Sequence, residues 1–229
     1  MADTLESMMS VMSLGSGQPP PFVVDTVETA ARLRSMVENQ NMVALDVEGV
    51  DLCRFGSVEL VQVGTVGGTA VVDCAAAVFE KHVLPWLREL LEDESVIKII
   101  HDPAVDADAL FHLLRIDLRS VHDTQSWHCV LTSEWRRKNL NDTLREAGLA
   151  TNDARDKQIY RDNPSFWATR PLTATMVELA AGDVLALMEL ALQQRKTASP
   201  HHTSMAESKS RQRLDFVRSC SETCLLRVH

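Results

Sequence analysis

The chain has 229 residues, of which 45% are hydrophobic, and this length suits one domain with a substantial core. Its formal net charge of −9 disfavours a general nucleic-acid binder, although bound metal ions could consume several acids and anchor a short polyanion. We expect no membrane attachment, because the sequence has no apolar run of about 18 residues and no basic segment before its apolar N-terminal residues.

The composition divides the chain into three parts. Residues 1–21 are rich in Ser, Gly, Pro and Met and predict a disordered leader. Residues 22–195 carry the periodic apolar pattern of a folded domain. Residues 196–229 predict a polar, disordered tail without a packed core, in which a short helix near Arg211–Val217 could form.

Within the central part, the pattern alternates between strands and helices. The elements expected in chain order are a helix near Glu28–Leu33 with Asp25 or Thr26 as its N-cap, strands at Met42–Glu48, Val58–Gly64 and Ala70–Asp73, a helix at Val78–Leu91, a strand at Val96–His101, a helix at Asp106–Leu114, a strand at Ser120–Asp123, and helices through Trp127–Trp135, Leu140–Ala147 and Thr173–Leu192. Early hairpins followed by parallel crossovers predict an α/β fold with one mixed five-stranded sheet and helices on both faces.

Five cysteines are scattered along the chain without regular spacing. An odd, irregular set favours reduced thiols in an intracellular protein, cytoplasmic or nuclear. Cys220 and Cys224 could form half of a zinc site, but the sequence offers no second pair with ligand spacing, and we do not expect zinc.

Two acids end the first predicted strand. Asp46 and Glu48 are two residues apart, and alternate strand residues point to the same face. Like charges this close repel unless a cation lies between them, and carboxylate oxygens suit Mg²⁺ or Mn²⁺. The alternative is that both acids simply face water at the end of the strand.

Further acids could complete a metal site. The segment after the fourth strand offers Asp102, Asp106 and Asp108, of which Asp106 could begin a helix; helix capping or a solvated face is the favoured interpretation for the other two. Asp183 is the only charge on the apolar face of the last helix, so it needs a partner. That partner is either an arginine such as Arg170 or a metal ion.

Other polar and aromatic residues have simpler interpretations. The four tryptophans, including Trp135, are expected to be packing groups. His101 is expected to be a satisfied polar group at the end of its strand. The basic run Arg136–Lys138 is either a solvated face or a feature that steers phosphate.

These segments together resemble the DEDD superfamily of 3′→5′ exonucleases, which contains RNase D and the Werner-type exonuclease domains. The first family motif matches Asp46 and Glu48, the second Asp106, and the third Ala180–Val184 with its Asp183. A subgroup of exonuclease 3′-5′ domain-containing proteins related to Egalitarian is more similar still, through Val47–Leu52, Leu60–Gly64, His122–Gln125, Asn163–Trp167 and Arg170–Leu172. The resemblance covers roughly residues 23–195.

This resemblance implies an RNase H-like fold in which Asp46, Glu48, Asp106 and Asp183 hold two Mg²⁺ or Mn²⁺ ions. It also implies hydrolysis of the terminal phosphodiester of a single-stranded RNA or DNA 3′ end, with RNA favoured. A protein partner or a homodimer is compatible with it.

One departure from the family pattern concerns the attacking water. The family places a Tyr four residues before the last Asp, or a His five before it, whereas this chain has Leu179 and Glu178 there. Loss of a water-orienting group costs about 10²–10⁴ in rate. Tyr160, the only tyrosine, lies in another segment. The sequence therefore predicts a 3′-5′ exonuclease that is slow, or alternatively a non-catalytic RNA-binding or adaptor module on the same fold; an unrelated α/β protein is the remaining alternative.

Overall fold

The structure is a computed structural model that describes residues 19–152, 159 and 162–220. Most of the predicted leader and the last nine residues, including Cys224, lie outside the described residues. Within the described part, no helix combines the length and the apolar character that a bilayer span requires.

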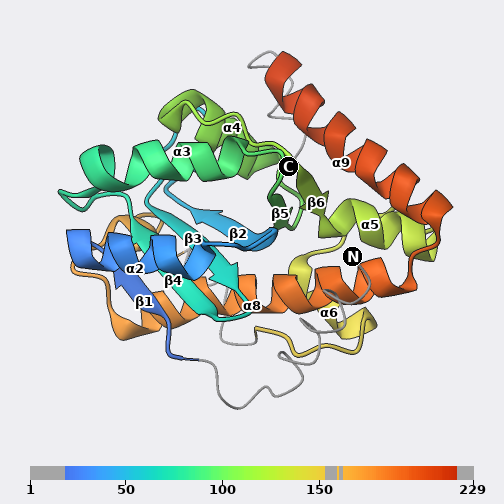
Figure 1. Cartoon of the computed structure of the whole chain (residues 1–229), viewed down its shortest axis with the longest axis horizontal. Helices are drawn as coiled ribbons and strands as arrows, with labels where there is room; N and C mark the ends of the chain where they lie inside the picture. The colour runs from blue at the N-terminus through green and yellow to red at the C-terminus, as the bar shows by residue number, and fades with distance from the viewer. Residues whose placement is uncertain (1–18, 153–158, 160–161, 221–229) are drawn as a thin grey trace.

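A mixed six-stranded sheet forms the centre of the fold, with the strand order β1-β4-β3-β2-β5-β6 (Figure 1). Strands β2, β3 and β4 form an antiparallel meander, and β5 and β6 continue the sheet parallel to β2. The predicted α/β class is confirmed, and the sixth strand is β1, a three-residue element too short to be recognised by its pattern. The bounds are β1 Phe22–Val24, β2 Met42–Glu48, β3 Leu60–Thr65, β4 Gly68–Asp73, β5 Ile97–Ile100 and β6 Val121–Asp123.

Most helices lie where the sequence predicts them. The helix expected at Val78–Leu91 instead begins as a π-helix, because Pro85 lacks the N–H that a regular turn would use and the Leu84 N–H bonds to Phe79. The bounds are α2 Val27–Val37, the π-helix η1 Phe79–Val83, α3 Leu84–Glu92, α4 Ala104–Leu114, α5 Thr124–Thr132, α6 Leu140–Glu146, the 3₁₀-helix η2 Phe166–Ala168, α8 Ala174–Thr197 and α9 Pro200–Ser219.

Helices cover both faces of the sheet, as expected. Helices α2, α3 and α4 pack on one face, against a core that includes Val43, Leu45 and Val47 of β2. The long helix α8 crosses the other face, against Met42 and Ala44 of the same strand (Figure 1). Because neighbouring residues of a strand point to opposite faces, the residues of β2 that follow Ala44 at intervals of two also face α8.

The expectation of an unpacked C-terminal tail is wrong for residues 200–219. These residues form α9, which packs against α4, α5 and β6. Its buried positions are Ala206, Ser210, Leu214 and Val217. Their spacing is helical, but two of the four are small, so the apolar stripe is weak in the sequence.

The favoured interpretation of Asp102 and Asp108 as capping or solvated acids is also wrong. Asp108 is fully buried and accepts hydrogen bonds from the backbone N–H of Arg54 (2.6 Å) and from its guanidinium (2.7 and 2.9 Å). Asp102 is half-buried and accepts hydrogen bonds from Arg137 and Arg213. Both acids therefore join segments that are far apart in the sequence.

The Arg54–Asp108 pair provides a test of this packing. We expect Asp108→Asn to lower the free energy of unfolding by about 3–5 kcal/mol, because it leaves a buried guanidinium without its carboxylate. Urea denaturation measures the change. In the matched control, Glu94→Gln, the lost partner of Arg119 is exposed, so the denaturation midpoint should not move. Equal midpoints for the two variants would contradict this role of Asp108.

Candidate metal centre

Strand β2 directs two carboxylates toward α8. Asp46 and Glu48 lie on the same face as Ala44, near the carboxyl end of the strand, where β3 pairs with both of them. Glu48 is buried and Asp46 is half-buried. Their predicted orientation to a common face is therefore borne out by the packing, and they do not point into open water.

Helix α8 contributes the third carboxylate. One oxygen each of Asp46, Glu48 and Asp183 lie within 4.8 Å of one another, and Asp183 is 2% exposed. The helix can approach this closely because Gly64 faces Val184, where an added Cβ would lie 3.2 Å from the valine Cβ. Three clustered carboxylates form an oxygen-only donor set, which fits a hard divalent cation.

The fourth predicted acid lies outside this group. Asp106 is 8% exposed and lies in the first turn of α4, directly after the end of β5. The structure thus brings three of the four predicted residues together, and leaves Asp106 beyond the 4.8 Å that encloses the others. Two ions about 4 Å apart need ligands over a wider region than one ion does, so a fourth acid just outside the group is compatible with a two-ion site.

Asn152 is a residue of the site that the sequence did not reveal. Its amide Nδ2 donates to Oδ1 of Asp183 (2.9 Å) and to the carbonyl of Leu179 (3.2 Å). Gly182 makes room for it, since a Cβ there would lie 2.6 Å from Asn152 Nδ2. Asn141 holds the Asn152 backbone by two reciprocal hydrogen bonds of 3.1 Å. An asparagine in a loop carries no pattern that would distinguish it from a turn residue.

Gln62 is a second such residue. It pairs with Asp46 across β2 and β3, so its side chain lies on the face that α8 covers, and it is fully buried. Neither its amide nitrogen nor its amide oxygen hydrogen-bonds to any residue that the structure describes. Buried polar groups are nearly always satisfied, so this amide beside Asp46 fits a site that also holds a bound ion with its water ligands.

The two positions where the family pattern has its water-orienting group differ sharply. Leu179 is buried and packs with Leu60, Val71 and Trp167. Glu178 is exposed and is not part of the carboxylate group. Tyr160 lies outside the described residues. Position 179 of this chain thus supplies core packing, not a hydrogen bond to water.

His101 lies beside the cluster at the end of β5. Its Nδ1 is 2.8 Å from Thr124 Oγ1 and its Nε2 is 3.0 Å from the carbonyl of Lys138, which satisfies both nitrogens as expected. Burial lowers the pKa of His101, although the negative charges of Asp123 and Asp46 oppose the shift. A neutral His101 therefore adds no positive charge to the site.

Asp183 does not meet the arginine that the sequence offered as its alternative partner. Arg170 instead joins Asp73, through hydrogen bonds of 2.7 and 3.0 Å, and the carbonyls of Trp167 and Thr169. This pair ties the segment before α8 to the end of β4. It leaves Arg170 with a structural role.

A second group with metal-ligand chemistry has an internal cation. His128, Glu134 and Glu146 have ligand atoms within 4.8 Å of one another. The ammonium group of Lys138 already donates to both glutamates, at 2.5 and 2.6 Å. The positive charge that this group needs is therefore supplied by the protein.

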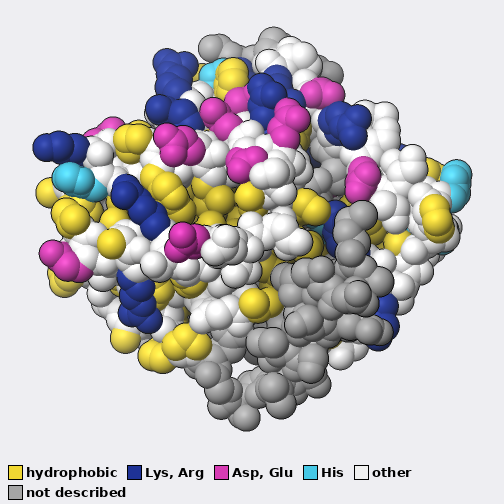
Figure 2. Space-filling model, viewed as in Figure 1, with side chains coloured by type: hydrophobic (Ala, Val, Ile, Leu, Met, Phe, Trp, Pro, Cys, Tyr) yellow, Lys and Arg dark blue, Asp and Glu magenta, His cyan; other side chains and the backbone are white. Residues whose placement is uncertain are grey.

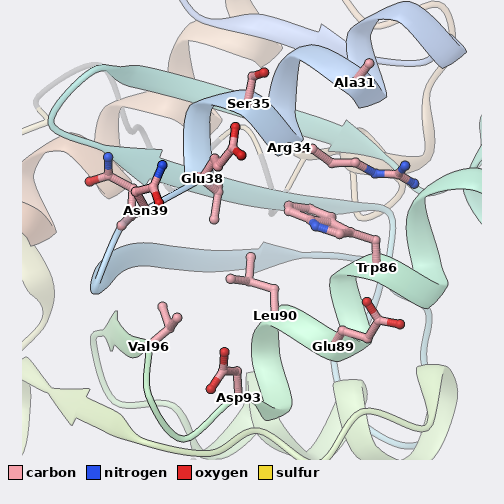
Figure 3. A pocket seen from close by; sticks show the side chains of 12 residues that line it. Ala31, Arg34, Ser35, Glu38, Asn39, Trp86, Glu89, Leu90, Asp93 and Val96 are labelled. Atoms are coloured by element: carbon pink, nitrogen blue, oxygen red, sulfur yellow. The ribbon is translucent and has the colours of Figure 1, made fainter.

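A separate cavity lies away from the carboxylates. It measures about 540 Å³ and opens between α2 and α3, where Figure 3 shows Arg34 beside Trp86 and the acids Glu38, Glu89 and Asp93 around the rim. Its residues precede β2 and β5, so it lies at the amino ends of these strands. The carboxylates lie at the opposite ends.

Comparisons with known proteins point to one family. The sequence profile of a family described as 3′-5′ exonuclease matches residues 21–197. The piRNA biogenesis protein EXD1 of Homo sapiens is 27% identical over 174 residues, which cover 68% of this chain and 32% of that protein. This chain therefore spans about a third of the length of that relative.

Solved structures share the fold. The crystal structure of Trypanosoma brucei RNase D in complex with an RNA is 22% identical, with a TM-score of 0.76 over 93% of this chain and 74% of that one. Brucella melitensis NrnC with bound Mg²⁺ is 22% identical, with a TM-score of 0.66 over 92% of this chain and 94% of that one.

Asn152 can be tested as a residue that orients Asp183. We expect Asn152→Ala to weaken Mn²⁺ binding about 10- to 100-fold, because groups that fix a metal ligand affect affinity to this extent. Gly182→Ala should act similarly by displacing Asn152. Isothermal titration calorimetry measures the affinity, with the exposed Asn163→Ala as control. Unchanged Mn²⁺ affinity in both site variants would show that Asp183 needs no such support.

Proposed function

Because this chain belongs to the 3′-5′ exonuclease family, we propose that it hydrolyses the terminal phosphodiester of a nucleic-acid strand at its 3′ end. The observation that carries the proposal is the meeting of Asp46, Glu48 and Asp183 within 4.8 Å, on two elements that are distant in the sequence. Three carboxylates in one place offer the oxygen donors that a hard divalent cation prefers.

In this proposal, Asp46, Glu48 and Asp183 hold one or both of two Mg²⁺ or Mn²⁺ ions, and Asp106 completes the site from α4. When bound, such ions lower the pKa of a water molecule and stabilise the leaving oxygen. Asn152 keeps the Asp183 carboxylate in place. Gln62 provides a buried amide that can donate to and accept from ordered water beside Asp46.

Single-stranded 3′ ends are the proposed substrate, with RNA favoured. Two relatives support this choice: one protein of similar fold was solved with RNA, and the human relative is named for piRNA biogenesis. The net charge of −9 agrees with a substrate that is held mainly through metal ions and local contacts, since the chain as a whole is acidic.

We propose that catalysis is slow. Leu179 replaces the hydroxyl that would orient the attacking water and packs in the core, and Glu178 is exposed outside the carboxylate group. The loss corresponds to about 10²–10⁴ in rate. The same observation favours the second candidate function, a non-catalytic RNA-binding or adaptor module that retains the carboxylates for metal-dependent binding.

A digestion assay separates the two functions. We expect a 5′-labelled single-stranded RNA to shorten from its 3′ end when Mn²⁺ or Mg²⁺ is added, and Asp46→Asn to abolish the products, because it removes a metal-ligand charge. Denaturing gels of a time course measure the rate. The matched control is Asp51→Asn, three residues beyond Glu48.

A variant that restores the missing tyrosine hydroxyl at position 179 provides a second test in the same assay. Leu179→Tyr should raise the rate by up to the 10²–10⁴-fold that a water-orienting group contributes. Retained RNA binding without any shortening, in both the native protein and Leu179→Tyr, would contradict the enzyme and leave the binding module.

Gln62 provides an independent test with two readouts. We expect Gln62→Met to raise the free energy of unfolding in EDTA by about 1–3 kcal/mol, because it removes a buried amide that has no described protein partner. The same change should lower the rate of RNA shortening. A variant that is destabilised and fully active would show that the amide serves the fold alone. The control is Gln40→Met, in the loop before β2 and at the opposite end of that strand from the carboxylates.

A further inference from the structure

A smaller cavity lies at the same edge of the sheet as the carboxylate cluster. It measures about 300 Å³ and opens between the loop after α5 and helix α9. Strands β2, β5 and β6 run parallel, so their carboxyl ends, which lead to Glu48, Asp102 and Asp123, lie side by side. Neighbouring strands are about 4.8 Å apart, which places β6 roughly 10 Å from β2.

Two aromatic rings line this cavity, one from the loop and one from the helix. Trp135 is 58% exposed and lies in the loop, and Phe216 is 41% exposed and lies on α9. Trp135 is therefore not the packing group that the sequence predicted. Among the described residues, four large hydrophobic side chains are exposed, and two of them are these rings. Exposed rings that line one cavity suggest a ligand with a flat face.

Three cations accompany the rings. Arg137 and Arg213 both donate to the single carboxylate of Asp102, and Lys209 Nζ lies 4.3 Å from the centre of the Trp135 ring. Burial and the nearby Arg213 lower the pKa of Arg137, so an added anion would stabilise its charged form. The second acid of the cavity, Asp123, is buried, and burial raises its pKa.

The lining of the cavity holds more bases than acids. Figure 2 shows Lys and Arg side chains interspersed with Asp and Glu on the face viewed as in Figure 1, without one continuous basic surface. The cavity instead combines three bases with two rings within a small volume. Rings that stack on bases and cations that contact phosphates are the two components of single-strand recognition.

We propose that this cavity binds a nucleotide of a single-stranded nucleic acid, on the 5′ side of the end that enters the carboxylate cluster. The base stacks on Trp135 or Phe216, and the phosphate contacts Arg137, Lys209 or Arg213. The proposal rests on the proposed function, because it extends the path of the same strand. RNA and DNA share this chemistry, and both are used in the test.

The test measures binding without hydrolysis. Fluorescence anisotropy follows 5′-labelled 12-nucleotide RNA and DNA in EDTA, where neither metal anchoring nor cleavage contributes. We expect Trp135→Ala to weaken binding about 5- to 150-fold, the range that loss of one stacked base produces. Lys209→Gln should weaken binding and reduce the slope of log affinity against log salt by about 0.7.

Two matched controls separate the cavity from general surface effects. Phe55→Ala removes an aromatic ring that is 62% exposed but lies outside the cavity. Arg211→Gln removes a base of α9 that lines a different cavity. Both should bind as the native protein does, and thermal melting should show all four variants folded. Arg137 and Arg213 are left unchanged because Asp102 makes them part of the fold.

Several outcomes would overturn the proposal. The first is that neither the RNA nor the DNA binds, and the second is that Trp135→Ala leaves the affinity unchanged. The third is that an oligoglutamate displaces the RNA equally well from the native protein and from Trp135→Ala. The result is separable from catalysis. Trp135-dependent binding without any shortening of RNA retains the cavity and rejects the enzyme, whereas shortening with an unchanged KM in Trp135→Ala rejects the cavity alone.

Discussion

The packing of α8 across the sheet is the interaction on which the candidate site depends. If ionised, two carboxylates 4.8 Å apart repel by about 3.5 kcal/mol at an effective dielectric constant of 20. On one side of Asp183, Val184 and Leu187 pack against Ala44, and on the other, Leu179 packs against Leu60. Each such buried side chain contributes about 1.5–3 kcal/mol, so apolar packing can offset a repulsion of this size.

Close approach of the helix depends on two glycines. Gly64 allows the backbone of α8 to pack near β3, and Gly182 admits the amide of Asn152 against the helix. A Cβ at either position would meet an atom at 3.2 Å or less. The position of the Asp183 carboxylate therefore depends on these two glycines as much as on the side chains that contact the helix.

Leu179 and Gln62 are both buried, but one is apolar and the other is polar. Leu179 contributes to the apolar core where a related enzyme would have a group that orients water, which favours stability over rate. Gln62 keeps a polar amide in a fully buried place, which favours the site over stability.

The sequence by itself determined the α/β class, the order of most elements and the two acids of β2, because periodicity and strand alternation are local properties. The acid on α8 was also predicted, since it interrupts an apolar stripe. Only the tertiary structure decided which acids meet. It placed Asp108 with Arg54, Asp102 with two arginines and Asp183 with Asn152, and these pairs join residues 31–111 positions apart. It also packed α9, whose small buried residues carry little signal, and placed Trp135 and Phe216 of α9 at one cavity. Such contacts follow from how helices and strands fit together, which no local pattern encodes.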